Sequence, residues 1–259
     1  MTLIGLDTSL PVAAVCVLRD DGQAYRTPPP SEERLLGPAE HSRELLPEVD
    51  RLMRKSGADW SEVHAIAVGV GPGTFTGLRI GIATARALAQ ALEVPIHPVP
   101  SLEALAAGAV EIAERTAKAV LALIDARRHE VFAALYRVEQ GRSSNDASSG
   151  TSPRLEQVWP PAVTSPDALL QRMLELPAAP ICVGDWAIRS RVKLEGAGAE
   201  VPDSESGLHA VDALSICRLA AGVEPVRHQD VYPVYLRVPD AEKSKPRKDK
   251  RERAERATR

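Results

Sequence analysis

The 259-residue chain is poor in cysteine and in aromatic side chains, and both shortages limit what it can be. Its three cysteines lie too far apart for a disulfide framework or a metal-binding motif, which suits a reducing compartment and predicts a cytoplasmic protein. With only two Phe, three Trp and four Tyr, the cores must be built from Ala, Leu, Val and Ile. No apolar stretch reaches about 18 residues, and no positively charged segment precedes the first strand, so we expect neither a membrane span nor a signal peptide.

The sequence also lacks the common patterns of catalytic centres. No two of its six histidines lie four residues apart, so a helical metal-binding pair of the metalloprotease type is not expected. It contains no Gly-x-Ser-x-Gly turn, and Cys16 lies in an apolar strand where a thiol fills the core rather than reacting. His41 stands alone near a predicted helix start, where we interpret it as a cap or a surface contact. We therefore predict no catalytic residue and no metal ligand in this chain.

Charge is unevenly distributed along the sequence. The net charge is −3, yet nine Lys or Arg and five Asp or Glu follow from Asp240 onward, which leaves −7 for the rest. We predict that residues 239–259 form a basic, disordered tail; the alternative is that this tail contacts RNA. A Ser-, Asn- and Gly-rich segment over residues 141–154 predicts a flexible surface loop.

A glycine-rich run at Gly69–Gly81 follows an apolar strand-like stretch and leads into a helix predicted over residues 78–92. Such a turn leaves backbone N–H groups open at a helix start, which suits an anion or a close backbone partner. The run is neither a Walker loop, because no Lys follows its last glycine, nor a dinucleotide fingerprint, because Thr74 stands at the third glycine position.

The same local pattern occurs twice along the chain: an apolar strand ends at an Asp, a turn follows, and a second strand begins. It occurs at Asp7 and again at Asp125. This repeat predicts an internal duplication. Its architecture is that of an α/β, actin-like (ASKHA) protein with a duplicated ribonuclease H-like fold, two lobes and a nucleotide cleft between them. We predict a first lobe over residues 1–101, rejoined by a helix near 207–222, and a second lobe over residues 102–206.

Two of the predicted helices carry further assignments. A helix over residues 41–55 has one apolar face, and Pro47 would kink or restart it. Ser101 is the predicted N-cap of a helix over residues 102–116.

The Asp-bearing turns and the glycine run have two interpretations. In the first, Asp7 and Asp125 cap their own turns through their side chains. In the second, a degraded cleft retains a nucleotide or anion site. Neither Asp is followed by the glycine that would let backbone meet phosphate, so we favour the first interpretation. The residues of the second are Asp7, Thr8, Ser9, Gly71, Gly73, Thr74, Asp125 and Arg127.

Small residues recur every four positions along the helix that follows the glycine run. They form a flat stripe that could pack inside the chain or against another helix. We favour a partner interface that this stripe forms together with the apolar face of the helix over residues 41–55. Its predicted members are Leu45, Leu46, Val49, Leu52, Met53, Gly77, Arg79, Gly81 and Ala85.

Several motifs together resemble the TsaB (YeaZ) family. They are Gly71–Gly81, the segments Ile4–Ser9, His41–Pro47 and Ser101–Leu105, Asp125-Ala126-Arg127-Arg128, and Tyr232–Arg237, so the resemblance covers roughly residues 1–238. In most of the family Ser stands in place of Thr74.

The resemblance implies a required, non-catalytic partner of TsaD, a paralogue of the same fold that carries the metal and the chemistry. With the ATPase TsaE, the pair transfers a threonylcarbamoyl group to the adenosine following the anticodon in tRNAs that read ANN codons. No cofactor would be required by this chain, although ATP or ADP could lie at a shared interface, and a homodimer could form when TsaD is absent. The alternative is an enzyme of the same fold, either a nucleotide-binding ATPase or a metalloprotease.

Overall fold

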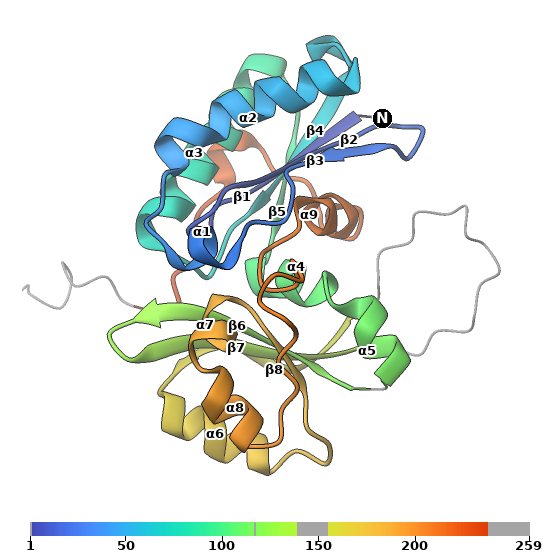
Figure 1. Cartoon of the computed structure of the whole chain (residues 1–259). Helices are drawn as coiled ribbons and strands as arrows, with labels where there is room; N and C mark the ends of the chain where they lie inside the picture. The colour runs from blue at the N-terminus through green and yellow to red at the C-terminus, as the bar shows by residue number, and fades with distance from the viewer. Residues whose placement is uncertain (1, 117, 139–154, 238–259) are drawn as a thin grey trace, which may run out of the picture.

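The computed structural model describes residues 2–116, 118–138 and 155–237 as a mixed α/β protein with two β-sheets (Figure 1). The predicted flexible loop over 141–154 and the predicted tail over 239–259 lie outside the described residues. No helix in the described part of the chain is both long enough and apolar enough to cross a bilayer.

The first sheet has the strand order β3-β2-β1-β4-β5. β1 pairs antiparallel with β2 and parallel with β4, so the predicted opening hairpin is confirmed. Its strands are β1 (Thr2–Asp7), β2 (Ala14–Leu18), β3 (Ala24–Arg26), β4 (Val63–Gly69) and β5 (Ile96–Val99).

The second sheet repeats this order, one strand shorter, as β8-β7-β6-β9. β6 pairs antiparallel with β7 and parallel with β9, as β1 does with β2 and β4. The predicted repeat of strand, Asp, turn and strand therefore corresponds to a repeated sheet topology. The strands are β6 (Val120–Arg127), β7 (Glu130–Val138), β8 (Leu155–Thr164) and β9 (Ile181–Val183).

Helices and sheets alternate in layers, as Figure 1 shows. α2 (His41–Ser56) and α3 (Phe75–Leu92) cover the outer face of the first sheet, and α9 (Ala213–Ala220) packs on its inner face against β1 and β2. α4 (Ser101–Ala107) and α5 (Val110–Thr116) lie between the sheets. The remaining elements are α1 (Glu32–Leu36), α6 (Pro166–Leu174), α7 (Asp185–Arg189), α8 (Arg191–Gly196) and two single turns, η1 (Trp60–Glu62) and η2 (His228–Asp230).

Three apolar clusters fill the spaces between these layers. One lies between the sheets and is built largely from Ala, Leu and Val. A second joins the first sheet to α2 and α3, and a third joins the second sheet to α6, α7 and α8. Alanine-rich helices allow close packing, which is how a chain with so few aromatic residues fills its interior.

The helix predictions are right in position and wrong in some details. α2 runs unbroken through Pro47, which faces solvent. The helix predicted over 102–116 is interrupted at Gly108, and Ser101 does not cap it: Pro100 holds the N-cap position, and the Ser101 hydroxyl bonds elsewhere. The last helix begins at Ala213 rather than near residue 208, because the Asp212 carboxylate accepts from the Leu214 N–H and caps it there.

Candidate functional site

The glycine run packs tightly against the turn that follows β1. A Cβ on Gly73 would lie 2.5 Å from the Cβ of Ser9, and one on Gly77 or Gly81 would collide with the carbonyl oxygen or the hydroxyl of Thr8. The Thr74 N–H also donates to the Ser9 carbonyl at 2.9 Å. Most of these glycines therefore serve close backbone approach inside the chain.

Asp7 uses both carboxylate oxygens within the chain. Its Oδ1 accepts from the N–H and the hydroxyl of Ser9 at 2.8 and 2.6 Å, and its Oδ2 accepts from the Ser101 hydroxyl at 2.7 Å. Burial raises the pKa of Asp7, while the bonds from Ser9 and Ser101 lower it. The predicted turn-capping role is confirmed, and no oxygen of Asp7 is open to a ligand.

Asp125 caps its own turn in the same way. Its Oδ1 accepts from the Arg127 N–H at 2.8 Å, and its Oδ2 lies 3.1 Å from the Arg127 guanidinium and 3.8 Å from that of Arg189. The Asp125 N–H in turn donates to Oδ1 of the buried Asp185 at 3.0 Å. Burial raises the pKa of Asp185 to about 6. Asp185 was not among the predicted site residues, because nothing near it in the sequence indicates a contact with Asp125.

A pocket of about 660 Å³ lies where the glycine run, the β6–β7 turn and the C-terminal segment meet. It is lined by Gly73 and Thr74 from the run and by Asp125 and Arg127 from the end of β6. Four other predicted members of the anion site, Asp7, Thr8, Ser9 and Gly71, are buried and do not line it. The pocket therefore contains only four of the eight residues that the sequence predicted for the anion site. The pocket also contains Val234, Tyr235, Leu236 and Arg237, which belong to the family motif Tyr232–Arg237 but were not predicted as site residues.

Two polar side chains at this pocket have buried atoms without hydrogen-bond partners. Neither ring nitrogen of His41 is bonded, and neither is the hydroxyl of Thr74. His41 is 3% exposed, so it is neither the cap nor the surface contact predicted for it; Glu40 occupies the N-cap position of α2. Burial lowers the pKa of His41. The carboxylate of Asp7 and the backbone of Leu10, which lies near the ring but outside hydrogen-bond geometry, act in the opposite direction. The ring thus favours its neutral form, with one donor and one acceptor nitrogen.

An aromatic pair stands at the edge of the pocket. The rings of Phe75 and Tyr235 stack with centroids 5.3 Å apart, and the Arg79 guanidinium lies 3.8 Å from the Phe75 centroid. Arg79 Nε also donates to the Tyr235 hydroxyl at 3.1 Å. These contacts hold the segment around Tyr235 against the first turn of α3. That segment closes one side of the pocket.

The predicted partner interface is wrong for most of its members. Only Leu46, 55% exposed, and Arg79 face solvent. The others are buried within the chain, because the apolar face of α2 packs on the first sheet and the small-residue stripe of α3 packs on the turn after β1. The buried members are Leu45, Val49, Leu52, Met53, Gly77, Gly81 and Ala85.

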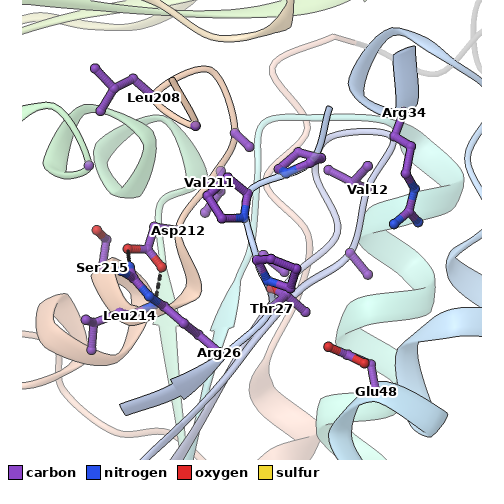
Figure 2. A pocket seen from close by; sticks show the side chains of 18 of the residues that line it. Val12, Arg26, Thr27, Arg34, Glu48, Leu208, Val211, Asp212, Leu214 and Ser215 are labelled. Carbon is purple, nitrogen blue, oxygen red and sulfur yellow. Dashed lines mark hydrogen bonds and ion pairs between the residues drawn. The ribbon is translucent and has the colours of Figure 1, made fainter. Parts of the chain in front are cut away.

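A larger pocket, of about 1140 Å³, lies between the β2–β3 edge, α1, α2 and the segment before α9. Figure 2 shows Arg26 directed at Asp212, with which it forms an ion pair. On the opposite wall Arg34 makes two bonds to the Glu44 carboxylate, at 2.8 and 2.7 Å. These four charged side chains are therefore paired inside the chain.

The described residues contain no group of three or more His, Cys, Asp or Glu side chains arranged to hold a metal ion.

Comparison with known proteins gives consistent matches. The family profile described as "TsaD: tRNA N6-adenosine threonylcarbamoyltransferase" matches residues 37–158. The chain is 33% identical to the tRNA threonylcarbamoyladenosine biosynthesis protein TsaB of Escherichia coli (strain K12), over 96% of this chain and 100% of that protein. It is 28% identical to the protein of the same name from Haemophilus influenzae, over 92% and 94% of the two chains. A crystal structure of a Pseudomonas aeruginosa protein described as similar to peptidase YeaZ matches with a TM-score of 0.70 and 33% identity, over 91% of this chain and 99% of that one.

Proposed function

Because this chain belongs to the TsaB family of tRNA threonylcarbamoyladenosine biosynthesis proteins, we propose that it is a required, non-catalytic partner of TsaD. In this role it supports threonylcarbamoyl transfer to the adenosine following the anticodon in tRNAs that read ANN codons. The observation that carries the proposal is the 33% identity to a TsaB protein over that protein's full length. TsaE completes the complex, tRNA is contacted indirectly, and the site of action is the cytoplasm.

The geometry of the Asp-bearing turns supports a scaffold rather than an enzyme. In an actin-like ATPase the two turns hold phosphate and metal across a cleft between two lobes. Here Asp7 is 1% exposed and accepts three hydrogen bonds within the chain, and Asp125 is bonded to Arg127. We infer an actin-like duplicated fold whose nucleotide cleft is degenerate on both sides.

The outer surface of α2 and α3 is the proposed contact with TsaD. Leu46 is an exposed apolar side chain on a helix whose other exposed positions are largely charged, and Arg79, Ala83 and Ala87 are exposed on α3. Small exposed residues let a second helix approach closely, so two such helix pairs can form a four-helix contact. The same surface would serve a homodimer when TsaD is absent, and ATP or ADP would lie at the shared interface.

The first test measures threonylcarbamoyladenosine formed on tRNA. TsaD, TsaE, threonylcarbamoyl-adenylate and ATP are supplied with and without this chain. Product that depends on the chain supports the required-partner role. Equal product in its absence overturns that role.

The second test concerns the surface. Leu46→Glu and Ala83→Arg should abolish association with TsaD in size-exclusion chromatography and leave the fold intact. Leu174→Glu is the matched control, because Leu174, at 70% exposed against 55% for Leu46, is an exposed apolar residue on α6, remote from α2 and α3. Normal association of both folded surface variants would reject this surface as the contact.

A further inference from the structure

We propose that the pocket of about 660 Å³ binds a phosphate group at the N-terminus of α3. Residues Gly73 to Gly77 line the pocket, so the first turn of this 18-residue helix faces it. The first backbone N–H groups of a helix have no acceptor within the helix, and the aligned peptide dipoles favour an anion there. Thr74, in the N-cap position, makes no capping hydrogen bond, and the first turn contains no acidic side chain.

His41 is the second, independent observation. It lines the same pocket with both ring nitrogens buried and unbonded. A buried polar atom without a partner destabilises the fold, so a ligand that supplies a partner to the His41 ring or to the Thr74 hydroxyl binds favourably here. The neutral ring can donate one N–H to a phosphate oxygen, and the hydroxyl can donate a second bond.

Arg127 supplies positive charge from the second sheet. It lines the pocket opposite the glycine run, with its side chain more than half exposed and paired to Asp125 at 3.1 Å. Asp125 also lies 3.8 Å from Arg189, so a ligand can share Arg127 without leaving the carboxylate unpaired. A guanidinium and several N–H donors around one point match the multiple oxygens of a phosphate.

Besides Asp125, which is paired to Arg127 and Arg189, two acidic groups lie close to His41, and neither opposes an anion strongly. Burial raises the pKa of Asp7, which disfavours its charged form. Glu44, the other acidic group close to His41, is bonded in a bidentate manner to Arg34.

The remaining walls are apolar and suit a phosphate carried on an organic group. Ile80, Phe132 and Leu236 line the pocket, and the Phe75–Tyr235 pair stands at its edge. The shared chemistry is a phosphate monoester or free phosphate. A nucleotide would use the apolar walls as well as the phosphate subsite, whereas inorganic phosphate would use the subsite alone.

The test uses the full-length purified chain without TsaD, so its outcome is separate from that of the partner assay. Inorganic phosphate and adenosine 5′-monophosphate are each titrated while the histidine ring signals are followed by NMR. We expect a saturable shift of the His41 ring signals with phosphate. Tighter binding of the nucleotide, in competition with phosphate, would identify a nucleotide phosphate as the ligand; equal binding would identify free phosphate.

Substitutions of pocket residues test whether phosphate binds in this pocket. His41→Leu and Thr74→Val should each weaken it about tenfold or more, because each removes a donor to the phosphate. His228→Leu and Thr84→Val are the matched controls, since neither residue lines the pocket, and they should bind as the unaltered chain does. Far-UV circular dichroism checks that each variant folds.

Two results would overturn the proposal. One is the absence of any saturable His41 shift with either probe, a measurement that needs no variant. The other is full binding in folded His41→Leu and Thr74→Val, which would place the anion on surface arginines instead.

Discussion

The Ser101 hydroxyl donates to Oδ2 of Asp7 at 2.7 Å and accepts from the Gly71 N–H at 3.1 Å. One buried serine at the start of α4 thus joins the turn after β1 to the glycine run, across 94 residues of sequence. All three groups are buried, so none can turn to water if this hydroxyl is removed.

Ser101→Ala should lower the free energy of unfolding by about 1–3 kcal/mol or more, because it leaves a carboxylate oxygen and a backbone N–H unsatisfied. Urea denaturation followed by circular dichroism measures this. Ser165→Ala is the matched control: Ser165 also stands at a helix start, but it is exposed and only caps α6, so its loss should be near 1 kcal/mol. Equal losses in the two variants would show that the buried bonds contribute nothing extra.

Gly77→Ala should destabilise the chain by about 1–3 kcal/mol or more, because the new methyl group would collide with the backbone carbonyl of Thr8. Thermal unfolding compares it with Gly196→Ala. A Cβ at Gly196, the last residue of α8, meets nothing within 4 Å, so that change should be neutral or slightly stabilising. A neutral Gly77→Ala would mean that α3 can shift away from the turn at little cost.

The sequence predicted the elements that depend on local patterns. Short apolar runs bounded by turns located β1, β2, β6 and β7, and the repeat of an Asp after a strand indicated the duplicated sheet order. The helical spacing of Leu45, Val49 and Leu52 located α2 and its apolar face. These features follow from periodicity within about a dozen residues.

The same periodicity could not say what covers an apolar face. A stripe that packs on the chain's own sheet and one that packs on a partner have the same spacing, so Leu45 was assigned to a partner surface although it is buried. Hydrogen bonds between residues far apart in the sequence could not be predicted either. Nothing near Ser101 or Asp185 in the sequence indicates Asp7 or Asp125, which lie 94 and 60 residues away. His41 was misjudged for the same reason, because its burial depends on a separate segment of chain.

The three cysteines should be unreactive in the native protein. All are buried, and burial raises the pKa of Cys182 to about 12; the pKa of Cys217 is also raised, by its hydrogen bond with Cys16 and by burial. A thiol must lose its proton to attack a disulfide reagent. Reaction with Ellman's reagent at pH 8 should therefore be slow and limited by unfolding, and all three thiols should react at once in denaturant. Fast labelling of even one thiol in the native chain would contradict this prediction.

Asp185 should make stability depend on pH. Its pKa is about 6 in the folded chain, above the ordinary value of 3.8, because the carboxyl is buried beside Asp125; Arg189 and Arg127 only partly offset this. The folded state therefore binds the proton more tightly than the unfolded state. The stabilisation that results is complete below about pH 3.8 and is lost as the pH rises through about 6. The shift corresponds to at most about 3 kcal/mol.

Asp185→Asn should remove this dependence, because the amide oxygen can still accept from the Asp125 N–H while the side chain no longer ionises. We expect the variant to gain stability relative to the unaltered chain between pH 4.5 and pH 7.5. Urea denaturation at the two pH values measures the gain, with Asp167→Asn as the control, since Asp167 is an exposed aspartate in the first turn of α6. If the unaltered chain and Asp185→Asn changed in parallel with pH, Asp185 would not be the titrating group, and its proton would be held no more tightly in the folded than in the unfolded chain.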